Sequence, residues 1–427
     1  MAVQKVDILV IGGGVIGASV ANELQAAGRS VTLIEKGQPG HGSSFANAGW
    51  LTPCFAMPLP QPGMFWKSVG WLLDANSPLY IKPEVNPTLF RWMWQFLRAM
   101  NEERMNESIT VLTAISTFSL EFYKQLATRT KRKIGFENRG LLMVSATEAG
   151  IDAANLEMQL MNARGIAGRS MSKDEVLKFE PALKPIVRGG VFFPDEAQAN
   201  PYETTLAIMD EFVAAGGRVI PFTEAFDFDV RDGRIARVHT TQGDFEAELV
   251  VLASGSWSNE IAKKLDLSIP ILGGKGYSMS VDMTEHKPQH PIMIIERKIA
   301  ITPFANSVRL AGTLELVDQD FSISSNRVRG IHRGAQEYMH FDKKDSVTEP
   351  LYDLSSARDV WRGLRPCTPD GVPVIGPSTK LQNLFYCAGH QLLGFQSAPG
   401  SGRLAADLIL NRTPLTDPRP FRADRFE

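Results

Sequence analysis

A glycine-rich turn near the N-terminus constrains the fold of this chain more than any other feature of its sequence. Residues 6–11 form a short apolar run, which is typical of a strand buried on both faces of a parallel sheet. The run leads directly into a G-x-G-x-x-G motif made of Gly12, Gly14 and Gly17. Residues 18–27 then show the spacing of apolar side chains that is typical of a helix. This order of strand, turn and helix predicts a dinucleotide-binding unit in an α/β fold.

The residues of this unit indicate which dinucleotide it binds. Gly12 permits the tight turn, Gly14 lets the backbone approach a pyrophosphate, and Gly17 lets helix and strand pack closely. A second strand over residues 30–34 ends at Glu35, about 20 residues past the turn, where a carboxylate accepts hydrogen bonds from an adenosine ribose. Because the same carboxylate would repel a 2′-phosphate, we do not expect NADP.

The residues after Glu35 favour FAD over NAD. A nicotinamide-binding domain would return to another short strand, whereas this chain enters residues 40–49, which are small and polar. Such a loop can wrap a long cofactor.

Composition excludes several other classes of protein. The chain has 427 residues, and its 45 Lys and Arg against 47 Asp and Glu give a net charge of −2. Because this charge produces no field that would recruit nucleic acid, we expect no nucleic-acid partner. The cysteines form no CxxC pair and no HExxH motif is present, so we predict no metal site and a reducing, cytoplasmic location. No apolar run reaches the roughly 20 residues of a spanning helix.

Further blocks along the chain carry a family resemblance. They are Ser44-Phe-Ala-Asn-Ala-Gly49, residues 249–257, 274–278 and 310–315, and the run from Trp361-Arg-Gly-Leu-Arg365 to Arg403. In order and spacing, these blocks resemble the small subunit of D-amino-acid dehydrogenases, a branch of the D-amino-acid oxidase and glycine oxidase superfamily. The resemblance covers nearly the whole chain. It implies a tightly but noncovalently bound FAD and a small amino-acid substrate.

We therefore expect an α/β protein in which a Rossmann-like FAD-binding domain is interleaved with an α+β substrate domain built on a mixed sheet. The FAD-binding domain is assigned to residues 1–55, 199–268 and 360–427. The substrate-binding domain is assigned to residues 56–198 and 269–359. Strands of the mixed sheet are predicted at residues 141–144, 190–193, 277–281, 293–295 and 308–312.

Four side chains are candidates for the catalytic site. Arg365 is our candidate for the substrate carboxylate, because a planar guanidinium matches a carboxylate with two hydrogen bonds and the same position serves this role in the similar family. The alternative is a structural arginine that bridges the domains. Tyr277 either donates to the same carboxylate, closes the pocket or is an ordinary strand tyrosine. His390 either contributes to the site or only caps the turn that follows it. Trp50 is either a wall over the flavin or a core residue.

The cofactor site is assigned to residues of the glycine turn, the polar loop, the third strand and the C-terminal block. Backbone N–H groups of residues 392–396 are expected to face the pyrimidine edge of the flavin. The full set is Gly12, Gly14, Val15, Ile16, Gly17, Glu35, Lys36, Ser43, Ser44, Asn47, Ala48, Gly49, Ala225, Phe226, Ser254, Gly255, Trp257, Leu392, Leu393, Gly394, Phe395 and Gln396.

The resemblance implies oxidation of a D-amino acid to an imine, which water converts to a 2-oxo acid and ammonia, with electrons passed to a quinone or another carrier. The alternative keeps the fold and changes the substrate to glycine, sarcosine or a cyclic imino acid such as hydroxyproline or proline, with a dehydrogenase or oxidase reaction. A non-catalytic FAD-binding subunit is a third interpretation. A nicotinamide-linked flavin reductase would need a second glycine motif, which the sequence lacks.

One segment is rich in aromatic and basic residues. It spans residues 65–98 and contains Trp66, Trp71, Trp92 and Trp94 among several phenylalanines, lysines and arginines. This composition suits a peripheral contact with the inner face of the cytoplasmic membrane, where a quinone would accept the electrons. The alternative is a pair of helices whose aromatic side chains pack on the substrate domain or on a neighbouring subunit.

Overall fold

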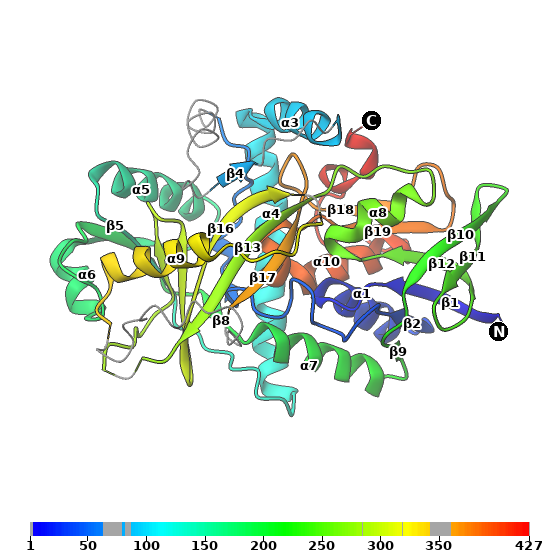
Figure 1. Ribbon diagram of the computed structural model, residues 1–427, viewed down its shortest axis with the longest axis horizontal. Helices are drawn as coiled ribbons and strands as arrows, with labels where there is room; N and C mark the ends of the chain where they lie inside the picture. The colour runs from blue at the N-terminus through cyan, green and yellow to red at the C-terminus, as the bar shows by residue number, and fades with distance from the viewer. Residues whose placement is uncertain are drawn as a thin grey trace.

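The computed structural model describes residues 3–62, 79–81, 87–283, 285–317, 319–341 and 360–426. Two large sheets lie side by side, and the first sheet lies nearer the N-terminus in Figure 1. Segments from distant parts of the sequence contribute to each sheet. No helix within these ranges is long and apolar enough to cross a membrane.

The first sheet carries the glycine turn. Its strands, in spatial order, are β10 (Ala225–Arg231), β11 (Arg234–Thr240), β12 (Phe245–Leu252), β1 (Gln4–Ile11), β2 (Val31–Ile34) and β9 (Arg218–Ile220), with β19 (Leu384–Ala388) beside β12 and β18 (Val374–Pro377) beside β19. The five strands β9, β2, β1, β12 and β19 are mutually parallel. The predicted buried strand is confirmed, because Ile8 to Ile11 of β1 are buried in the core.

Helices cover this parallel core. They are α1 (Val15–Ala26), α7 (Pro201–Ala214), α10 (Gly394–Ile409) and α4 (Glu102–Arg129). Apolar side chains of α1, α4 and α10 form one cluster with β1 and β2. Strands β10 and β11 form a hairpin that turns at Asp232 and Gly233, a residue pair typical of two-residue turns, with φ angles of +51° and +70°.

The second sheet is mixed, as predicted. Its strands, in spatial order, are β17 (Trp361–Cys367), β13 (Leu272–Val281), β16 (Ser307–Val317), β15 (Ile299–Phe304), β14 (Ile292–Ile294), β5 (Leu141–Ser145), β7 (Gly189–Phe193) and β6 (Arg169–Ser172), with β4 (Leu79–Ile81) beside β16. The pairs β14–β5 and β16–β4 are parallel, and the other pairs are antiparallel. All five segments that the sequence analysis assigned to this sheet lie in it.

One strand of the second sheet departs from the expected division of the chain. Strand β17 falls within residues 360–427, which we assigned to the FAD-binding part. It instead pairs with β13 along the edge of the second sheet, through Gly274 opposite Arg365 and Tyr277 opposite Arg362. The sequence around β17 contains no local signal for this partner, because strand pairing depends on residues about 90 positions away.

The two faces of the second sheet have different neighbours. Helix α9 (Ser325–Tyr338) packs on one face, against Tyr277, Met279 and Leu310. The opposite face receives residues 43–50, which lead into a short two-stranded sheet of β3 (Trp50–Leu51) and β8 (Ala197–Gln198). The remaining helical elements are α3 (Pro87–Ala99), α5 (Glu148–Asn162), α6 (Lys173–Phe179), α8 (Ser258–Lys263), η1 (Pro53–Phe55), η2 (Gly255–Trp257), η4 (Gln391–Leu393), η5 (Arg419–Phe421) and η6 (Ala423–Phe426).

Candidate functional site

The glycine turn joins β1, β12 and α1 in a space that admits no side chain. Gly12 has a φ of +116°, and a Cβ added there would lie 2.5 Å from the carbonyl oxygen of Ala253 at the end of β12. A Cβ added at Gly17 would overlap the carbonyl oxygen of Gly12. The tight turn and the close packing of helix on strand therefore require these two glycines.

Gly14 has a different environment from the other two glycines. It is the N-cap of α1, and a Cβ added there would meet only Ser44 Oγ, at 3.3 Å. Ser44 Oγ in turn accepts a hydrogen bond from the N–H of Val15 at 3.0 Å. Gly14 has no side chain that could cap the backbone N–H groups in the first turn of α1, and little other protein lies in front of it. This cradle fits the pyrophosphate of a dinucleotide.

The carboxylate of Glu35 lies against the same turn. Its Oε2 accepts from the N–H of Gly13 at 2.7 Å, and its Oε1 accepts from the N–H of Gly37 at 3.0 Å. Each carboxylate oxygen can accept a further hydrogen bond, so a ribose contact stays compatible with this position. The N–H of Thr223 donates to the carbonyl of Glu35 at 2.8 Å, just before β10 begins at Ala225, and Ala225 packs in one cluster with Ile11 and Ile34.

Residues 43–50 link this cradle to the second sheet. Four oxygen atoms of this segment form hydrogen bonds with that sheet. Ser43 Oγ donates to the Leu364 carbonyl at 2.5 Å, and the Ala46 carbonyl accepts from Ser278 Oγ at 2.7 Å. The Asn47 carbonyl accepts from Arg309 Nη1 and the Ala48 carbonyl accepts from Thr302 Oγ1, each at 2.8 Å. Ser278, Arg309 and Thr302 lie on one face of the sheet, since Arg309 pairs with Thr302 of β15 and with the position of β13 two residues after Ser278. This face therefore looks towards the predicted cofactor loop.

Arg365 lies on the same face of the second sheet. It is paired with Gly274, and its guanidinium crosses β13 directly over Gly276: a Cβ added at Gly276 would lie 2.5 Å from Arg365 Nη2 and closer still to Nη1 and Cζ. Nη1 donates to the carbonyl of Thr313 at 2.8 Å. Within the described ranges, no carboxylate pairs with this guanidinium, and its burial lowers the pKa of Arg365.

Thr313 of β16, whose carbonyl accepts the hydrogen bond from Arg365, has an unusual backbone conformation. Thr313 has a φ of +63°, and the register between β13 and β16 shifts next to it, between Lys275 and Tyr277. This bulge turns the Thr313 carbonyl towards Arg365. The Oγ1 atom of Thr313 is buried and has no hydrogen-bond partner among the described residues. A guanidinium without a carboxylate partner and a hydroxyl without a hydrogen-bond partner, both judged within the described residues, thus belong to two residues in contact on the sheet.

Tyr277 corrects part of our expectation. It lies opposite Arg362 in the register, on the face that α9 covers, whereas Arg365 lies on the other face. Its hydroxyl accepts from the N–H of Ser324 at 3.4 Å, and burial raises the pKa of Tyr277, with a smaller contribution from Glu315. Tyr277 and Arg365 are therefore not brought together on one carboxylate. Strand alternation explains this, because neighbouring positions of β13 point to opposite faces.

His390 points into the protein and does not cap the turn that follows. It precedes η4 but makes no side-chain capping bond; its Nε2 pairs with Ser401 Oγ of α10 at 3.0 Å. Its Nδ1 is buried without a hydrogen-bond partner in the described part of the chain. Burial lowers the pKa of His390 to about 3, so the ring is neutral at physiological pH. The capping interpretation was wrong.

The C-terminal block turns sharply before α10. Gln391 has a φ of +49°, Leu392 is exposed, and the N–H of Leu393 donates to the His390 carbonyl. The start of α10 is fixed from outside, since the Tyr123 hydroxyl donates to the Phe395 carbonyl at 2.6 Å. The side chain of Gln396 accepts from Thr52 Oγ1 at 3.0 Å. Residues 392–396 are thereby joined to the segment that follows Trp50.

Trp50 is held in the interface between residues 43–50 and the second sheet. Its indole Nε1 donates to Thr302 Oγ1 at 2.9 Å, and its ring meets the edge of Phe55. The side chain is buried in a cluster with Met143 and Met293. These contacts are those of a core residue, and the role of a wall over the flavin stays a prediction.

Gly276 and Thr313 are the residues that sequence reasoning missed. A glycine inside a strand often marks a close approach of another group, so Gly276 carried a signal of this kind. Thr313 carried none, because a bulge cannot be located from one strand alone.

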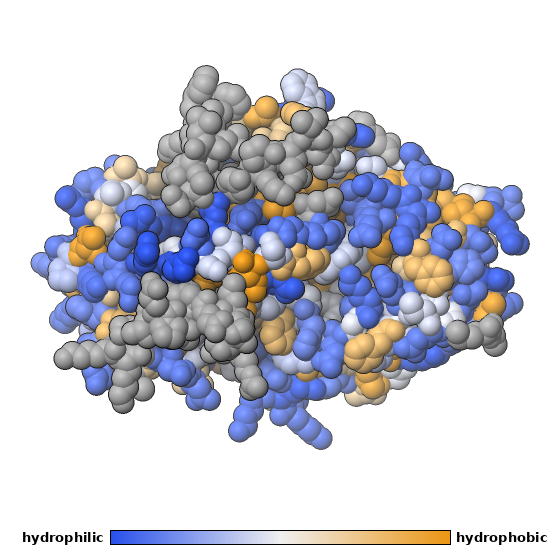
Figure 2. Space-filling view, in the orientation of Figure 1, coloured by the Kyte–Doolittle hydropathy of each residue, from blue (hydrophilic) through white to orange (hydrophobic). Residues whose placement is uncertain are grey.

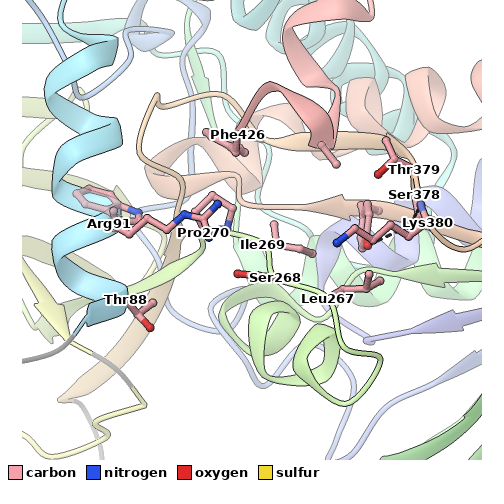
Figure 3. A pocket seen from close by; sticks show the side chains of 13 residues that line it. Thr88, Arg91, Leu267, Ser268, Ile269, Pro270, Ser378, Thr379, Lys380 and Phe426 are labelled. Carbon is pink, nitrogen blue, oxygen red and sulfur yellow. Dashed lines mark hydrogen bonds between the residues drawn. The ribbon is translucent and has the colours of Figure 1, made fainter.

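The pocket in Figure 3 lies elsewhere. It has a volume of about 70 Å³ and lies between α3, residues 267–270 and residues 378–380, with Arg91 and Lys380 on its lining. None of the residues assigned to the candidate site lines it.

Comparison with known proteins agrees with this geometry. Residues 7–408 match the family model described as FAD dependent oxidoreductase (DAO). The chain is 33% identical to a D-amino acid dehydrogenase of Vibrio atlanticus, over 94% of this chain and 95% of that protein. It superimposes on the glycine oxidase of Geobacillus kaustophilus with a TM-score of 0.75 at 23% identity, covering 98% of each chain. The L-proline dehydrogenase of P. horikoshii gives a TM-score of 0.73 at 20% identity, covering 100% of each. The two structures support the fold.

Proposed function

Because the chain belongs to the DAO family of FAD-dependent oxidoreductases, an enzyme family that acts on amino acids, we propose that its substrate is a D-amino acid. The D-amino acid dehydrogenases among its relatives support this choice over glycine or a cyclic imino acid. The products would be a 2-oxo acid and ammonia, formed when water hydrolyses the imine.

The observation that carries the proposal is the environment of Arg365. A partly buried guanidinium without a carboxylate partner is costly, because burial removes part of its hydration and no carboxylate among the described residues compensates the charge. The carboxylate of an amino acid would supply the missing charge and accept two parallel hydrogen bonds. The carbonyl of Thr313 holds one nitrogen of the guanidinium, so the remaining N–H groups are directed by the protein before substrate arrives.

The other residues of the site would position the cofactor and exclude water. The glycine turn and Glu35 would hold the ADP part of FAD, and residues 43–50 would lie between the cofactor and the second sheet. When bound, FAD accepts the hydride that leaves the carbon bearing the amine. Arg365 would fix the opposite end of the substrate, so that this carbon meets the flavin in one orientation. Among the described residues, the neutral His390 side chain hydrogen-bonds to Ser401 Oγ, and we assign it no proton-transfer role.

Anaerobic bleaching of the flavin tests the substrate class. The purified holoenzyme is mixed with matched D- and L-amino acids, glycine, sarcosine, and D- and L-proline, and the rate of absorbance loss is measured. We expect the D-amino acids to bleach the flavin at least tenfold faster than their L-forms. Preferential bleaching by glycine, sarcosine or proline would identify the alternative substrate class, and no bleaching by any of them would indicate a non-catalytic subunit.

We further propose that a quinone at a membrane surface accepts the electrons, on the evidence of α3. Phe90 and Trp94 are 64% and 62% exposed on one side of this helix, together with exposed Leu97. Figure 2 shows apolar side chains over α3 at the top of the view. Arg91 and Arg98 are also exposed, and the helix contains no acidic residue. Exposed aromatic and basic side chains on one helix suit an anionic lipid surface.

The opposite side of α3 anchors it to the protein. Trp92 is 2% exposed, stacks on Phe96 and donates its indole N–H to the Cys367 carbonyl at 3.0 Å. Of the tryptophans in this segment, Trp92 thus lies in the core and Trp94 at the surface, so Trp92 fits the packing interpretation and Trp94 is available for the proposed membrane contact. Trp66 and Trp71 lie outside the described residues.

Sedimentation with vesicles of anionic phospholipid tests the docking. We expect the parent protein to sediment with the vesicles and the double variant Phe90→Ala, Trp94→Ala to stay in solution. Leu156→Ala is the matched control, because Leu156 is an equally exposed apolar residue on α5. Equal sedimentation of the double variant and its parent would contradict the docking. Peroxide formation in air as fast as quinone reduction would contradict the choice of acceptor.

A further inference from the structure

Residues 319–324 lie between β16 and α9, which both belong to the second-sheet side of the molecule (Figure 1), and they reach η2 beside the first sheet. Gln319 Nε2 donates to the carbonyl of Ser256 in η2 at 2.9 Å. Phe321 then stacks on Trp257 of the same short helix, with ring centroids 5.6 Å apart and planes inclined by 13°. Residues 319–324, which we call the latch segment, therefore contact the element that follows β12.

Two cations extend this stack at both ends. Lys36 Nζ lies 3.8 Å from the centroid of the Trp257 ring, and Arg362 Cζ lies 5.1 Å from the centroid of the Phe321 ring. Arg362 also donates its Nε–H to the Phe321 carbonyl at 2.9 Å. Cations over aromatic faces attract the ring quadrupole, so all four side chains hold one another in a row. The row joins β2, η2, the latch segment and β17.

The base of the latch segment is fixed by a buried ammonium group. Lys275 of β13 is almost fully buried, and its Nζ donates to Asp320 Oδ2 at 2.7 Å. The other carboxylate oxygen accepts from the N–H of Ser322 at 2.8 Å. The hydrogen bond and the charge of Lys275 lower the pKa of Asp320 to about 2. The segment is thus held in the position that places Phe321 over Trp257.

The row lies beside the glycine turn. Lys36 directly follows Glu35, whose carboxylate accepts from the N–H of Gly13. Trp257 lies shortly after Ala253, whose carbonyl oxygen faces Gly12. Lys36 and Trp257 belong to the cofactor site that the sequence predicts, whereas Arg362, Phe321 and the rest of the latch segment do not. The substrate domain therefore contributes a side chain next to the predicted ADP site.

We infer that the latch segment, through the row Lys36–Trp257–Phe321–Arg362, retains FAD by tying the second sheet across the ADP end of the cofactor site. Phe321 is 37% exposed, although contact with water does not stabilise an apolar side chain. Its place over Trp257 is explained if it keeps Trp257 and Lys36 packed beside the bound nucleotide. Release of FAD would then require the latch segment to leave η2 first.

The release rate of FAD tests this role independently of turnover. The holoenzyme is diluted into buffer without FAD, and the return of free flavin fluorescence is followed. Phe321→Ala removes one aromatic stack and one cation–π contact, so we expect release roughly five to thirty times faster than in the parent. Phe321→Trp restores the ring and should restore slow release. Lys36→Met keeps the apolar stem and removes the charge, and it should accelerate release by about two- to fivefold.

A matched control separates retention from general loss of stability. Leu156→Ala removes an even more exposed apolar side chain from α5, and it should release FAD at the parent rate. Thermal unfolding of the FAD-free proteins should give the same midpoint for the parent and Phe321→Ala within about 2 °C. Parent-like release from both Phe321→Ala and Lys36→Met would overturn the inference, and so would equal acceleration by Phe321→Ala and Leu156→Ala. Neither result would bear on the amino-acid substrate.

Discussion

Gly276→Ala displaces the Arg365 guanidinium without changing any charge in the site. The added methyl group would lie 2.5 Å from Nη2 and closer to Nη1 and Cζ, whereas ordinary contact begins at 3.4 Å. The guanidinium therefore has to retreat by roughly 1 to 2 Å, a misplacement that can cost on the order of 100-fold in rate. We expect kcat/KM for D-amino acids to fall by about two decades, which corresponds to about 2.7 kcal/mol of transition-state stabilisation.

Folding should not suffer from this substitution. The φ of Gly276 lies outside the left-handed region, and alanine is less costly than glycine in a strand by about 0.5–1 kcal/mol. Gly312→Ala is the matched control, because its methyl group would enter the same sheet beside Ile331, 3.2 Å away, on the face that α9 covers. Steady-state kinetics with a dye acceptor and the flavin-to-protein absorbance ratio are measured for both variants.

The reasoning would be refuted if Gly276→Ala bound FAD normally and kept its kcat/KM within threefold of the parent. An equal loss in Gly312→Ala would also refute it, since that change leaves Arg365 untouched.

Gly14→Val should give a folded but colourless protein, because a Cβ at this position meets only Ser44 Oγ in the protein while the side chain occupies the approach of the pyrophosphate. Flavin absorbance after purification checks this, and full flavin content would show the cradle to be misplaced. Burial raises the pKa of Glu196 from 4.5 to about 8, so between these pH values the folded state holds a proton that the unfolded state releases. The free energy of unfolding therefore falls as pH rises through this range, by up to about 1.4 kcal/mol per pH unit. Glu196→Gln keeps an acceptor for the N–H of Cys54 and should remove this pH dependence, as measured by chemical unfolding at pH 5 and pH 8. An unchanged dependence of unfolding free energy on pH would contradict the raised pKa of Glu196.

Local patterns predicted the elements that carry the cofactor site. The glycine spacing and the apolar run before it each depend on neighbouring residues, and each was found where expected. These features follow from backbone sterics and from hydrophobic periodicity, both of which are visible in a window of a few residues.

The side-chain positions that could not be predicted from the sequence depend on contacts between segments that are distant along the chain. Tyr277 lies on the opposite face from Arg365 because of the register of β13 against β17. Thr313 turns its carbonyl to Arg365 because of a bulge that exists only in the paired strands. The stack of Phe321 on Trp257 joins positions 64 residues apart that no periodicity connects. Such contacts depend on which strands meet, and one sequence leaves that choice open.

The central claim is that Arg365 binds the carboxylate of an amino acid. It is tested most directly by comparing Arg365→Ala with the parent on two substrates of similar size, a D-amino acid and the corresponding amine without a carboxylate. Leaving the carboxylate unpaired in a buried site should cost about 3 to 5 kcal/mol, so we predict a loss of two to four decades in kcat/KM for the amino acid. The amine should change by less than threefold. If Arg365→Ala retains its FAD and oxidises the amino acid as efficiently as the parent does, the carboxylate binds elsewhere and the claim is wrong.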